Sequence, residues 1–416
     1  MRPTRTLLAH AAAASSRLLA LAGPADEALS GYFRSQRQLG QHDRAFIAEA
    51  VFAVLRRRRS LEAAAGSAEP RALLAAALVR VFGLSGRALE GLFEAALLAR
   101  VRAVDFAALP AAVRVDLPDW LWERLVSRHG EEEATRIAQG LLNAAPLDLR
   151  VNLARVGRDE VLARLAHDRL SASATPYSPA GIRLAGKPPI NRHALFREGL
   201  VEVQDEGSQL LAWLLGPRRG EMIADYCAGA GGKALAIAML TRGTGRLYAM
   251  DVSARRLEAL APRAARAGIT NIHPVVLSGE NDVRGKRLAG KLDRVLVDAP
   301  CSGFGTLRRN PDLKWRHGPA AIEELAHKQR GILRAASRLV RPGGRLVYAT
   351  CSILHEENDA VADAFQEAHA EFRPLSCSAL LADQRIALDT GERLRLWPHR
   401  HATDGFFAAA FERAAP

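Results

Sequence analysis

The hydrophobic and polar positions follow a helical period over residues 1–140. Segments rich in Ala and Leu are separated by short breaks, and β-branched runs are scarce. The breaks fall at Gly23-Pro24, Gly66-Ser67, Gly83 and Pro110. This pattern predicts an all-helical N-terminal domain over residues 1–140.

The pattern changes after residue 140. Residues 147–152 alternate like a strand, residues 158–165 have helical spacing, and residues 171–189 are rich in Ser, Pro and Gly. We therefore expect a small α+β module over residues 141–206.

From Glu221 onward, apolar segments typical of buried strands alternate with segments of helical period. The predicted strands are residues 222–228, 246–252, 272–277, 292–299 and 345–350, and the predicted helices are residues 234–241, 254–267, 320–339 and 356–370. Alternating strands and helices imply right-handed crossovers and a parallel sheet. The fold class of residues 207–416 is therefore α/β, a doubly wound Rossmann-like domain that binds its ligand at the carboxyl ends of the strands.

A glycine-rich turn, Asp225–Lys233, follows the first of these strands. Gly229, Gly231 and Ala234 satisfy the G-x-G-x-x-G/A pattern of nucleotide-binding turns, and Asp251 ends the next strand, where it can bond a ribose. A P-loop is excluded, because the residue after Lys233 is Ala234 instead of Ser or Thr. The turn alone does not distinguish a nicotinamide dinucleotide from S-adenosylmethionine.

Two cysteines follow later strands of the same predicted sheet. Cys301 comes shortly after Asp298, and Cys351 comes directly after Thr350. A lone cysteine is usually an inert apolar residue in the core. Two cysteines and an aspartate at the ligand edge favour a reactive role for at least one of them.

Composition and charge narrow the class of partner. The 416 residues carry 58 Lys and Arg against 45 Asp and Glu, a formal net charge of +13, which favours a polyanion. Only six cations are lysines, and all of them follow residue 150. The run Arg56–Arg59 is explained equally well as a solvated helix end and as a phosphate contact.

The same composition makes other classes improbable. The four cysteines are too few and too widely spaced for a disulfide framework or a zinc site, and no uncharged apolar run is long enough for a membrane span. We therefore expect a cytoplasmic monomer with reduced thiols, without a metal and without a membrane partner.

Several motifs, in order, resemble those of the RsmB/Sun-type RNA (cytosine-5)-methyltransferases. They are residues 204–210, Asp225–Lys233, Asp298–Gly303, Arg309–Asp312 with Lys314-Trp315, and Tyr348–Ser352 followed by Glu356-Glu357-Asn358. The match covers residues 145–411, and residues 1–140 are similar to the NusB-like domain of some members. Four residues depart from the family pattern: Gly229, Ala230, Ala234 and His355.

The resemblance implies an enzyme that forms 5-methylcytosine in RNA through a covalent adduct, with S-adenosylmethionine as methyl donor. It assigns Cys351 as nucleophile, Asp298 to ring nitrogen 3, Cys301 to product release, and Lys233 to the cofactor or target base. The opposite assignment, with Cys301 as the nucleophile, would resemble the arrangement in DNA cytosine methyltransferases. The implied cofactor-binding residues are Cys227, Ala228, Gly229, Ala230, Gly231, Gly232, Lys233, Asp251 on the ribose, Asp282 near the adenine, and Asp298. Glu280 and Asn281 are alternatives to Asp282.

A basic segment after Cys301 is expected to hold RNA around an extruded base. It contains Arg308, Arg309, Lys314 and Arg316, with Trp315 among them; Trp315 suits core packing equally well. Ribosomal RNA is the favoured partner, with transfer RNA as the alternative. Two other functions stay open at this point: a nicotinamide-dependent oxidoreductase, and a non-catalytic RNA-binding or assembly protein.

Overall fold

The computed structural model describes residues 3–280 and 282–415, which form two compact units. The first unit comprises Met1–Ala144 and Thr306–Pro319, and the second comprises Ala145–Gly305 and Ala320–Pro416. The first unit thus includes a short segment that follows Cys301 in sequence. Within the described residues, no helix combines the length and apolar character needed to cross a bilayer.

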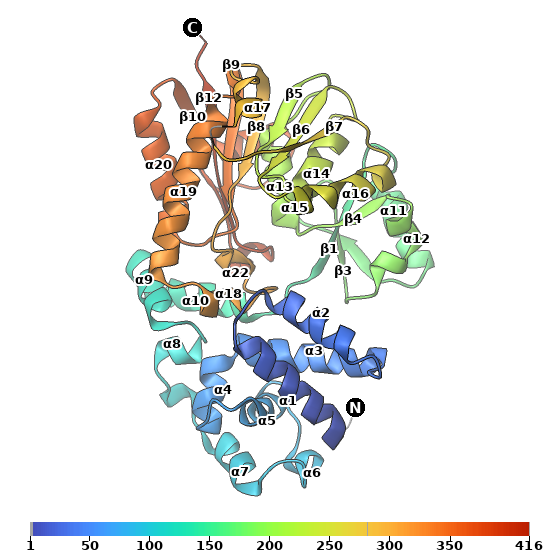
Figure 1. Cartoon of the computed structure of the whole chain (residues 1–416), viewed down its shortest axis with the longest axis vertical. Coiled ribbons are helices and arrows are strands. Elements are labelled where there is room, and N and C mark those ends of the chain that lie inside the picture. Colours follow the sequence, from blue (N-terminus) through green and yellow to red (C-terminus); the bar gives the residue numbers. More distant parts are fainter. Residues whose placement is uncertain (1–2, 281, 416) are drawn as a thin grey trace. The chain divides into compact units, whose positions relative to one another are not determined.

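The first unit consists of helices, as its sequence period predicts (Figure 1). They are α1 (Arg5–Leu19), α2 (Ala25–Ser35), α3 (Gln41–Arg56), α4 (Arg58–Ala65), α5 (Pro70–Arg80), α6 (Gly86–Leu89), α7 (Ala95–Ala103), α8 (Ala111–Arg114), α9 (Asp119–His129), α10 (Glu131–Leu142) and α18 (Leu313–Arg316). Along α3, Ile47, Val51 and Val54 recur at helical spacing and are completely buried. They pack into cores that also include residues of α1 and α5.

The four-arginine run forms the junction between α3 and α4 and is tied to its own unit. Arg56 donates to the Arg308 carbonyl oxygen at 3.1 Å. Arg58 pairs with Glu62 at 2.8 Å, and Arg59 pairs with Asp119 at 2.7 Å. Arg57 lies 4.0 Å from Asp116. All four guanidinium groups therefore have partners inside the helical unit.

The segment Thr306–Pro319 supplies donors to the C-terminal end of α3. The Lys314 ammonium donates to the Arg56 carbonyl oxygen at 2.9 Å, and the Trp315 indole N–H donates to the Leu55 carbonyl oxygen at 2.7 Å. The last carbonyls of a helix lack partners within that helix, so both side chains act as a C-terminal cap. Lys314 is only 2% exposed. The prediction that it holds RNA is therefore wrong, because its side chain is buried inside the first unit.

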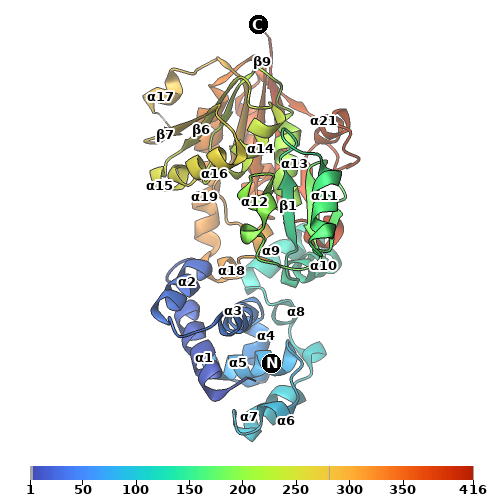
Figure 2. The same cartoon turned by 90° about the vertical axis from the view of Figure 1, so that its right-hand side faces the viewer.

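The second unit begins with a small antiparallel sheet of strand order β2-β3-β1-β4. Figure 2 labels its strand β1 together with the helices α11 and α12. The elements are β1 (Leu147–Val151), α11 (Arg158–His167), β2 (Ala172–Ala174), β3 (Gly181–Leu184), α12 (Ala194–Arg197) and β4 (Val201–Val203). β1 and α11 lie where the sequence pattern predicts a strand and a helix. Arg150 of β1 donates to the Gly232 carbonyl oxygen at 2.8 Å, which links this sheet to the glycine-rich turn.

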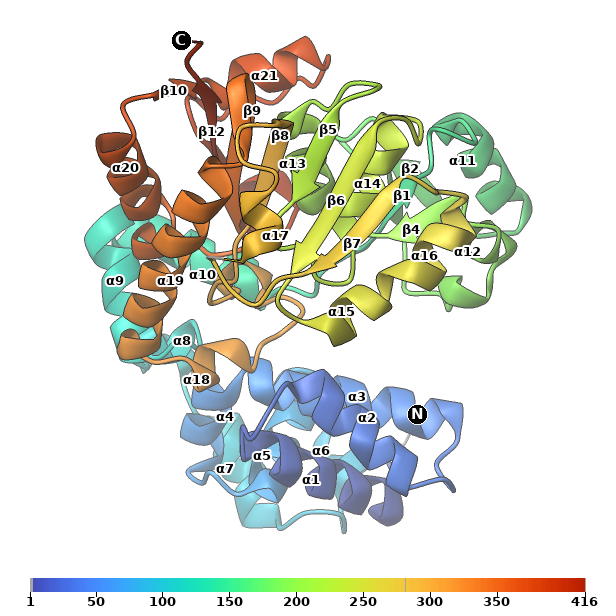
Figure 3. The same ribbon diagram turned by 45° about the horizontal axis from the view of Figure 1, so that its top comes forward.

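A larger sheet of order β10-β12-β9-β8-β5-β6-β7, with β11 beside β12, dominates the second unit (Figure 3). Its strands are β5 (Met222–Asp225), β6 (Arg246–Asp251), β7 (Ile272–Val276), β8 (Leu292–Asp298), β9 (Val340–Thr350), β10 (Phe372–Leu375), β11 (Leu394–Leu396) and β12 (Phe406–Arg413). The helices are α13 (Glu206–Leu215), α14 (Gly232–Leu240), α15 (Ala254–Glu258), α16 (Leu260–Ala267), α17 (Val283–Lys286), α19 (Pro319–Ser337), α20 (Asp359–Ala368), α21 (Cys377–Asp383) and α22 (Pro398–His401). β5 to β9 pair in parallel, which confirms the predicted doubly wound fold.

Alternate residues of each central strand point to opposite faces of this sheet. In β8, Leu296 packs with α13 and α14, whereas Val295 and Val297 pack with α19 and α20. Side chains alternate along a strand, so a strand covered on both faces must be apolar throughout. The continuous apolar runs in the sequence follow from this three-layer packing.

Two features differ from the sequence expectation. The single helix predicted over residues 254–267 is two helices, α15 and α16, with Pro262 in the first turn of α16. Proline has no amide proton to continue a helix but is tolerated in a first turn. The strands β10, β11 and β12 after residue 370 were not predicted, and β12 pairs antiparallel with β9.

Burial of Lys314 makes the stability of the first unit depend on pH. Burial lowers the pKa of Lys314 to about 7, although Asp116 opposes the shift. An unfolded lysine has a pKa near 10.4 (roughly), so between these values the unfolded chain binds more protons and stability rises with pH. The rise approaches about 1.4 kcal/mol per pH unit.

Unfolding curves of the full chain at pH 6 to 9 test this expectation. Lys314→Met should lack the Lys314 part of this rise, so the difference in unfolding free energy between the two proteins should grow with pH; at pH 9 the lost cap should cost about 1–3 kcal/mol. Curves for the two proteins that stay parallel from pH 7 to 9 would show that Lys314 remains charged in the folded state.

Candidate active site

The turn between β5 and α14 contains glycines, so backbone without side chains lies at the carboxyl edge of the large sheet. Gly231 has φ +82°, and a β-carbon there would lie 2.2 Å from Leu260 Cδ1. Only glycine fits both the left-handed backbone and this contact. Gly229, with φ +55°, donates its N–H to Asp251 Oδ2 at 2.8 Å, so the turn is tied to the end of β6.

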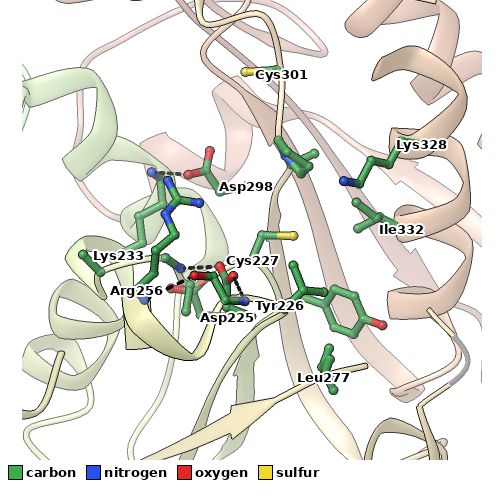
Figure 4. Close-up of a pocket in the computed structure, with 18 of the residues that line it drawn as sticks. Asp225, Tyr226, Cys227, Lys233, Arg256, Leu277, Asp298, Cys301, Lys328 and Ile332 are labelled. Atoms are coloured by element: carbon green, nitrogen blue, oxygen red, sulfur yellow. Dashed lines mark hydrogen bonds and ion pairs between the residues drawn. The ribbon is translucent and has the colours of Figure 1, made fainter. Parts of the chain in front are cut away.

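A cavity of about 920 Å³ opens beside this turn (Figure 4). Eight of the ten predicted cofactor residues line it: Cys227, Ala228, Gly229, Ala230, Gly232, Lys233, Asp251 and Asp298. Cys301 and Cys351 line it as well. The structure therefore brings the glycine turn, the acidic strand ends and both cysteines to one cavity.

Two predicted residues do not line the cavity. Gly231 faces α16, as its contact with Leu260 shows. Asp282 caps α17, and its carboxylate accepts from the Ser278 and Arg284 backbone N–H groups at 2.7 Å each. The Arg284 side chain and these bonds lower the pKa of Asp282. Glu280 lines the cavity instead, while Asn281 lies outside the described residues.

Asp225 is a buried acid that the sequence analysis did not assign to the site. It lines the cavity but is 0% exposed, and within the described part of the chain neither carboxylate oxygen has a hydrogen-bond partner. Burial raises the pKa of Asp225 to about 7, while the nearby Lys233 opposes the shift. A buried carboxyl group without a partner is costly, which suits a group that accepts a bond from a bound molecule.

Lys233 and Asp298 form an ion pair across the cavity. Lys233 Nζ lies 2.5 Å from Asp298 Oδ2 (Figure 4). Burial disfavours the charged form of Lys233, but the attraction and hydrogen bond of Asp298 outweigh it and raise the Lys233 pKa. The pair therefore holds a proton next to the two cysteines.

The thiols of Cys301 and Cys351 are in contact, with 3.4 Å between their sulfur atoms. The hydrogen bond to Cys351, together with burial, raises the pKa of Cys301 well above its ordinary value. Burial likewise raises the pKa of Cys227, which lines the cavity. Cys377 is completely buried in the core and plays no part in the site.

Two further lining residues, Lys328 and Ile332, come from α19 (Figure 4). They are four residues apart and so lie on one face of the helix. Neither belongs to a motif at a strand end. The only signal for Lys328 in the sequence is that lysine is rare in this chain.

The parallel sheet, the glycine turn and the acid at the end of β6 are the features of a Rossmann-like nucleotide-binding domain, and two thiols in contact lie at its cavity. Comparison with known proteins narrows this class. The family model for the 16S rRNA methyltransferase RsmB/F matches residues 212–412, and the model for the ferredoxin-like domain of RsmF/B-like methyltransferases matches residues 117–191.

Relatives cover most of the chain. A probable ribosomal RNA small subunit methyltransferase B from Synechocystis sp. is 36% identical over 313 residues, which are 75% of this chain and 70% of the relative. The corresponding protein of Bacillus subtilis is 34% identical over 304 residues, 73% of this chain and 67% of the relative. The crystal structure of PH0851 superimposes with a TM-score of 0.80 at 26% identity, covering 99% of both chains.

The chain therefore belongs to the RsmB/F family of 16S rRNA methyltransferases. It is an S-adenosylmethionine-dependent methyltransferase. This membership favours methyl transfer over the nicotinamide-dependent alternative and over a role without catalysis.

Proposed function

We propose that this protein methylates carbon 5 of a cytosine in small-subunit ribosomal RNA through a covalent bond to Cys351. The observation that carries the proposal is the pair of touching thiols at a cavity that also holds the Lys233–Asp298 ion pair. The names of the relatives support the choice of RNA.

A cysteine is needed because carbon 5 of cytosine is a weak nucleophile. Addition of a thiolate to carbon 6 makes carbon 5 electron-rich, which is covalent catalysis by an activated nucleophile. We assign the attack to Cys351, as the family resemblance implies, and the contact of 3.4 Å lets the Cys301 S–H donate to the Cys351 sulfur. The Cys351 Sγ–C6 bond forms in this step.

The negative charge that develops on the ring needs a proton at nitrogen 3. Asp298 is the carboxyl group nearest to the Lys233 ammonium, and the raised pKa of Lys233 keeps the proton on this pair. We propose that the proton of this pair passes from Lys233 through Asp298 to nitrogen 3 as charge develops on the ring, so that Asp298 delivers it and Lys233 orients Asp298. S-adenosylmethionine supplies the methyl group that carbon 5 takes up.

Product release requires a proton to leave carbon 5 and the Cys351 Sγ–C6 bond to break. The Cys301 sulfur lies 3.4 Å from the Cys351 sulfur, next to the bond that must break. As the Cys351 Sγ–C6 bond breaks, Cys301 gives its S–H proton to the departing Cys351 sulfur, and the Cys301 thiolate so formed takes the proton from carbon 5. The raised pKa of Cys301 makes that thiolate a strong base. We therefore assign Cys301 to this step.

The cavity fits the methyl donor. The bare turn at Gly229 admits close approach of the ligand, and the partnerless carboxyl group of Asp225 can accept a hydrogen bond from an amino group. We assign Asp251 to the ribose and Glu280, in place of Asp282, to the adenine, because Glu280 lines the cavity and the Asp282 oxygens are committed to α17. The target base must leave its stack to reach these groups.

Cys351→Ala should lower methyl transfer to small-subunit rRNA by at least about a thousandfold, because the nucleophile is lost. Binding of S-adenosylmethionine, followed by calorimetry, should change less than about threefold, below the 1.4 kcal/mol of a tenfold change. Activity is measured as labelled methyl incorporation, with nucleoside mass spectrometry for 5-methylcytidine. A Cys351→Ala protein that still forms 5-methylcytidine at the wild-type rate sinks the assignment, and transfer to tRNA alone corrects the substrate.

Cys301→Ala should trap the reaction after addition, because the adduct cannot be released. A slowly migrating protein–RNA band should accumulate on a denaturing gel in the presence of S-adenosylmethionine. The double variant Cys301→Ala/Cys351→Ala is the matched control and should give no such band. If the single variant gives no band and turns over normally, Cys301 is not the release residue.

Glu280→Ala should weaken binding of S-adenosylmethionine by roughly tenfold or more, the loss of a hydrogen bond to a charged group. Glu324→Ala, on the exposed side of α19, is the matched control and should bind normally. Asp282→Ala is compared in the same titration. The adenine assignment moves back to Asp282 if its variant loses binding and Glu280→Ala does not.

A further inference from the structure

The two loops that carry the cysteines are built alike. Each cysteine is followed by a serine, Ser302 after Cys301 and Ser352 after Cys351. Both serines are buried, at 0% and 2% exposure, and their hydroxyl oxygens lie 3.2 Å apart. The cysteine pair and the serine pair therefore run side by side across the two loops.

Both serine hydroxyls donate to one oxygen of Glu357. Ser302 Oγ lies 2.5 Å from Glu357 Oε2, and Ser352 Oγ donates to the same oxygen. The other oxygen, Oε1, accepts from the Ser302 N–H at 2.7 Å and from Gln329 Nε2 at 3.1 Å. Glu357 is 0% exposed, so this carboxylate is enclosed by four neutral donors.

Burial of the Glu357 carboxylate away from water costs free energy. A buried carboxylate needs a cation or several hydrogen bonds to be tolerated. Within the described residues, no Lys, Arg or His forms an ion pair with Glu357. Its charge is balanced only by donors, two of which are the residues next to the thiols.

The loops have little regular structure of their own. Residues 299–303 and 352–354 belong to neither a helix nor a strand. One backbone bond joins the two loops, from the Gly305 N–H to the Cys351 carbonyl oxygen at 2.8 Å. It holds the first loop four residues after Cys301 and not at Cys301 itself. The two positions that follow the cysteines are linked by the contact between the serine hydroxyls and by the bonds that both hydroxyls donate to Glu357.

Gln329 and Tyr348 hold Glu357 in turn. Gln329 Nε2 also donates to the Pro300 carbonyl oxygen at 3.0 Å, one residue before Cys301. The Tyr348 hydroxyl donates its one proton to the Glu357 carbonyl oxygen at 2.5 Å, and Gln329 Oε1 lies 3.2 Å from the same hydroxyl oxygen. Glu357 is thus anchored to α19 through its carboxylate and to β9 through its backbone carbonyl oxygen.

We propose that Glu357 is a positioning residue: through Ser302 and Ser352, its carboxylate fixes the separation of the Cys301 and Cys351 thiols. The role assigned to the thiols rests on the function proposed above. The geometric part of the proposal concerns the folded protein alone. Loss of Glu357 should affect methyl transfer and product release together, because both thiols move.

Two substitutions separate shape from charge. Glu357→Gln keeps the size: its amide oxygen can accept from Ser302 N–H and Gln329, and its amide N–H₂ can donate to the two serine hydroxyls, which rotate. Glu357→Ala removes the link. Ser302→Ala/Ser352→Ala removes only the hydroxyl bonds and leaves Glu357 in place.

The first measurement uses free full-length protein and needs no RNA or cofactor. Diamide takes two electrons and two protons from two thiols, and mass spectrometry of peptides follows formation of the Cys301–Cys351 disulfide. Glu357→Ala and Ser302→Ala/Ser352→Ala should both slow this reaction at least tenfold, whereas Glu357→Gln should stay within about threefold of wild type. Glu367→Ala, exposed on α20, is the control and should react like wild type.

The second measurement is steady-state kinetics with small-subunit rRNA. Glu357→Ala should lower kcat by on the order of a hundredfold, the effect of misplacing a reacting group by about 1 Å, with KM for S-adenosylmethionine nearly unchanged. Glu357→Gln should recover most of kcat. A general loss of folding would instead reduce cofactor binding and the melting temperature.

The outcomes are distinct. If Glu357→Ala is folded and forms the disulfide at the wild-type rate, the proposal is wrong. If Glu357→Ala does not fold, Ser302→Ala/Ser352→Ala decides in the same way. The disulfide rate does not depend on the reaction catalysed, so an active Cys351→Ala protein would overturn the proposed function without touching this result.

Discussion

The parallel pairing of β5, β6, β8 and β9 is the constraint on which the rest of the second unit depends. Asp225, Asp251 and Asp298 are each the last residue of a strand, and Cys351 directly follows one. They are far apart in the sequence, and only the common direction of the strands brings them to one edge. The apolar packing on both faces stabilises that pairing, and the chemistry of the cavity follows from it.

The central part of the fold could be predicted because its signals are local. Strands covered on both faces read as continuous apolar runs, and the helices between them keep a helical period. The C-terminal strands gave no such signal. β12, for example, is buried throughout Phe406–Phe411, so its sequence shows no alternation of apolar and polar residues. No turn motif in the sequence indicates which strand it pairs with. Its place beside β9 is set by tertiary contacts that the sequence does not reveal.

The candidate site likewise has a part that could be predicted from the sequence and a part that could not. The glycine turn and both cysteines are motifs at strand ends, so their convergence could be predicted. Glu280 and Asp282 could not be ranked, because the length of the loop after β7 decides which carboxylate faces the cavity. Lys314 and Lys328 show most clearly what the sequence alone could not predict. Lys314 is nearer to Cys301 in sequence but is buried in the first unit, whereas Lys328 returns to the cavity on α19.

The cap on α3 has a consequence for the order in which the chain can fold. The donors for the Leu55 and Arg56 carbonyl oxygens are Trp315 and Lys314, which lie in the second half of the chain. During synthesis from the N-terminus, the helices of the first unit are complete long before these residues leave the ribosome. The first unit therefore acquires its last structural contacts only after the strands β5 to β8 have been made, so its maturation is tied to synthesis of the catalytic sheet.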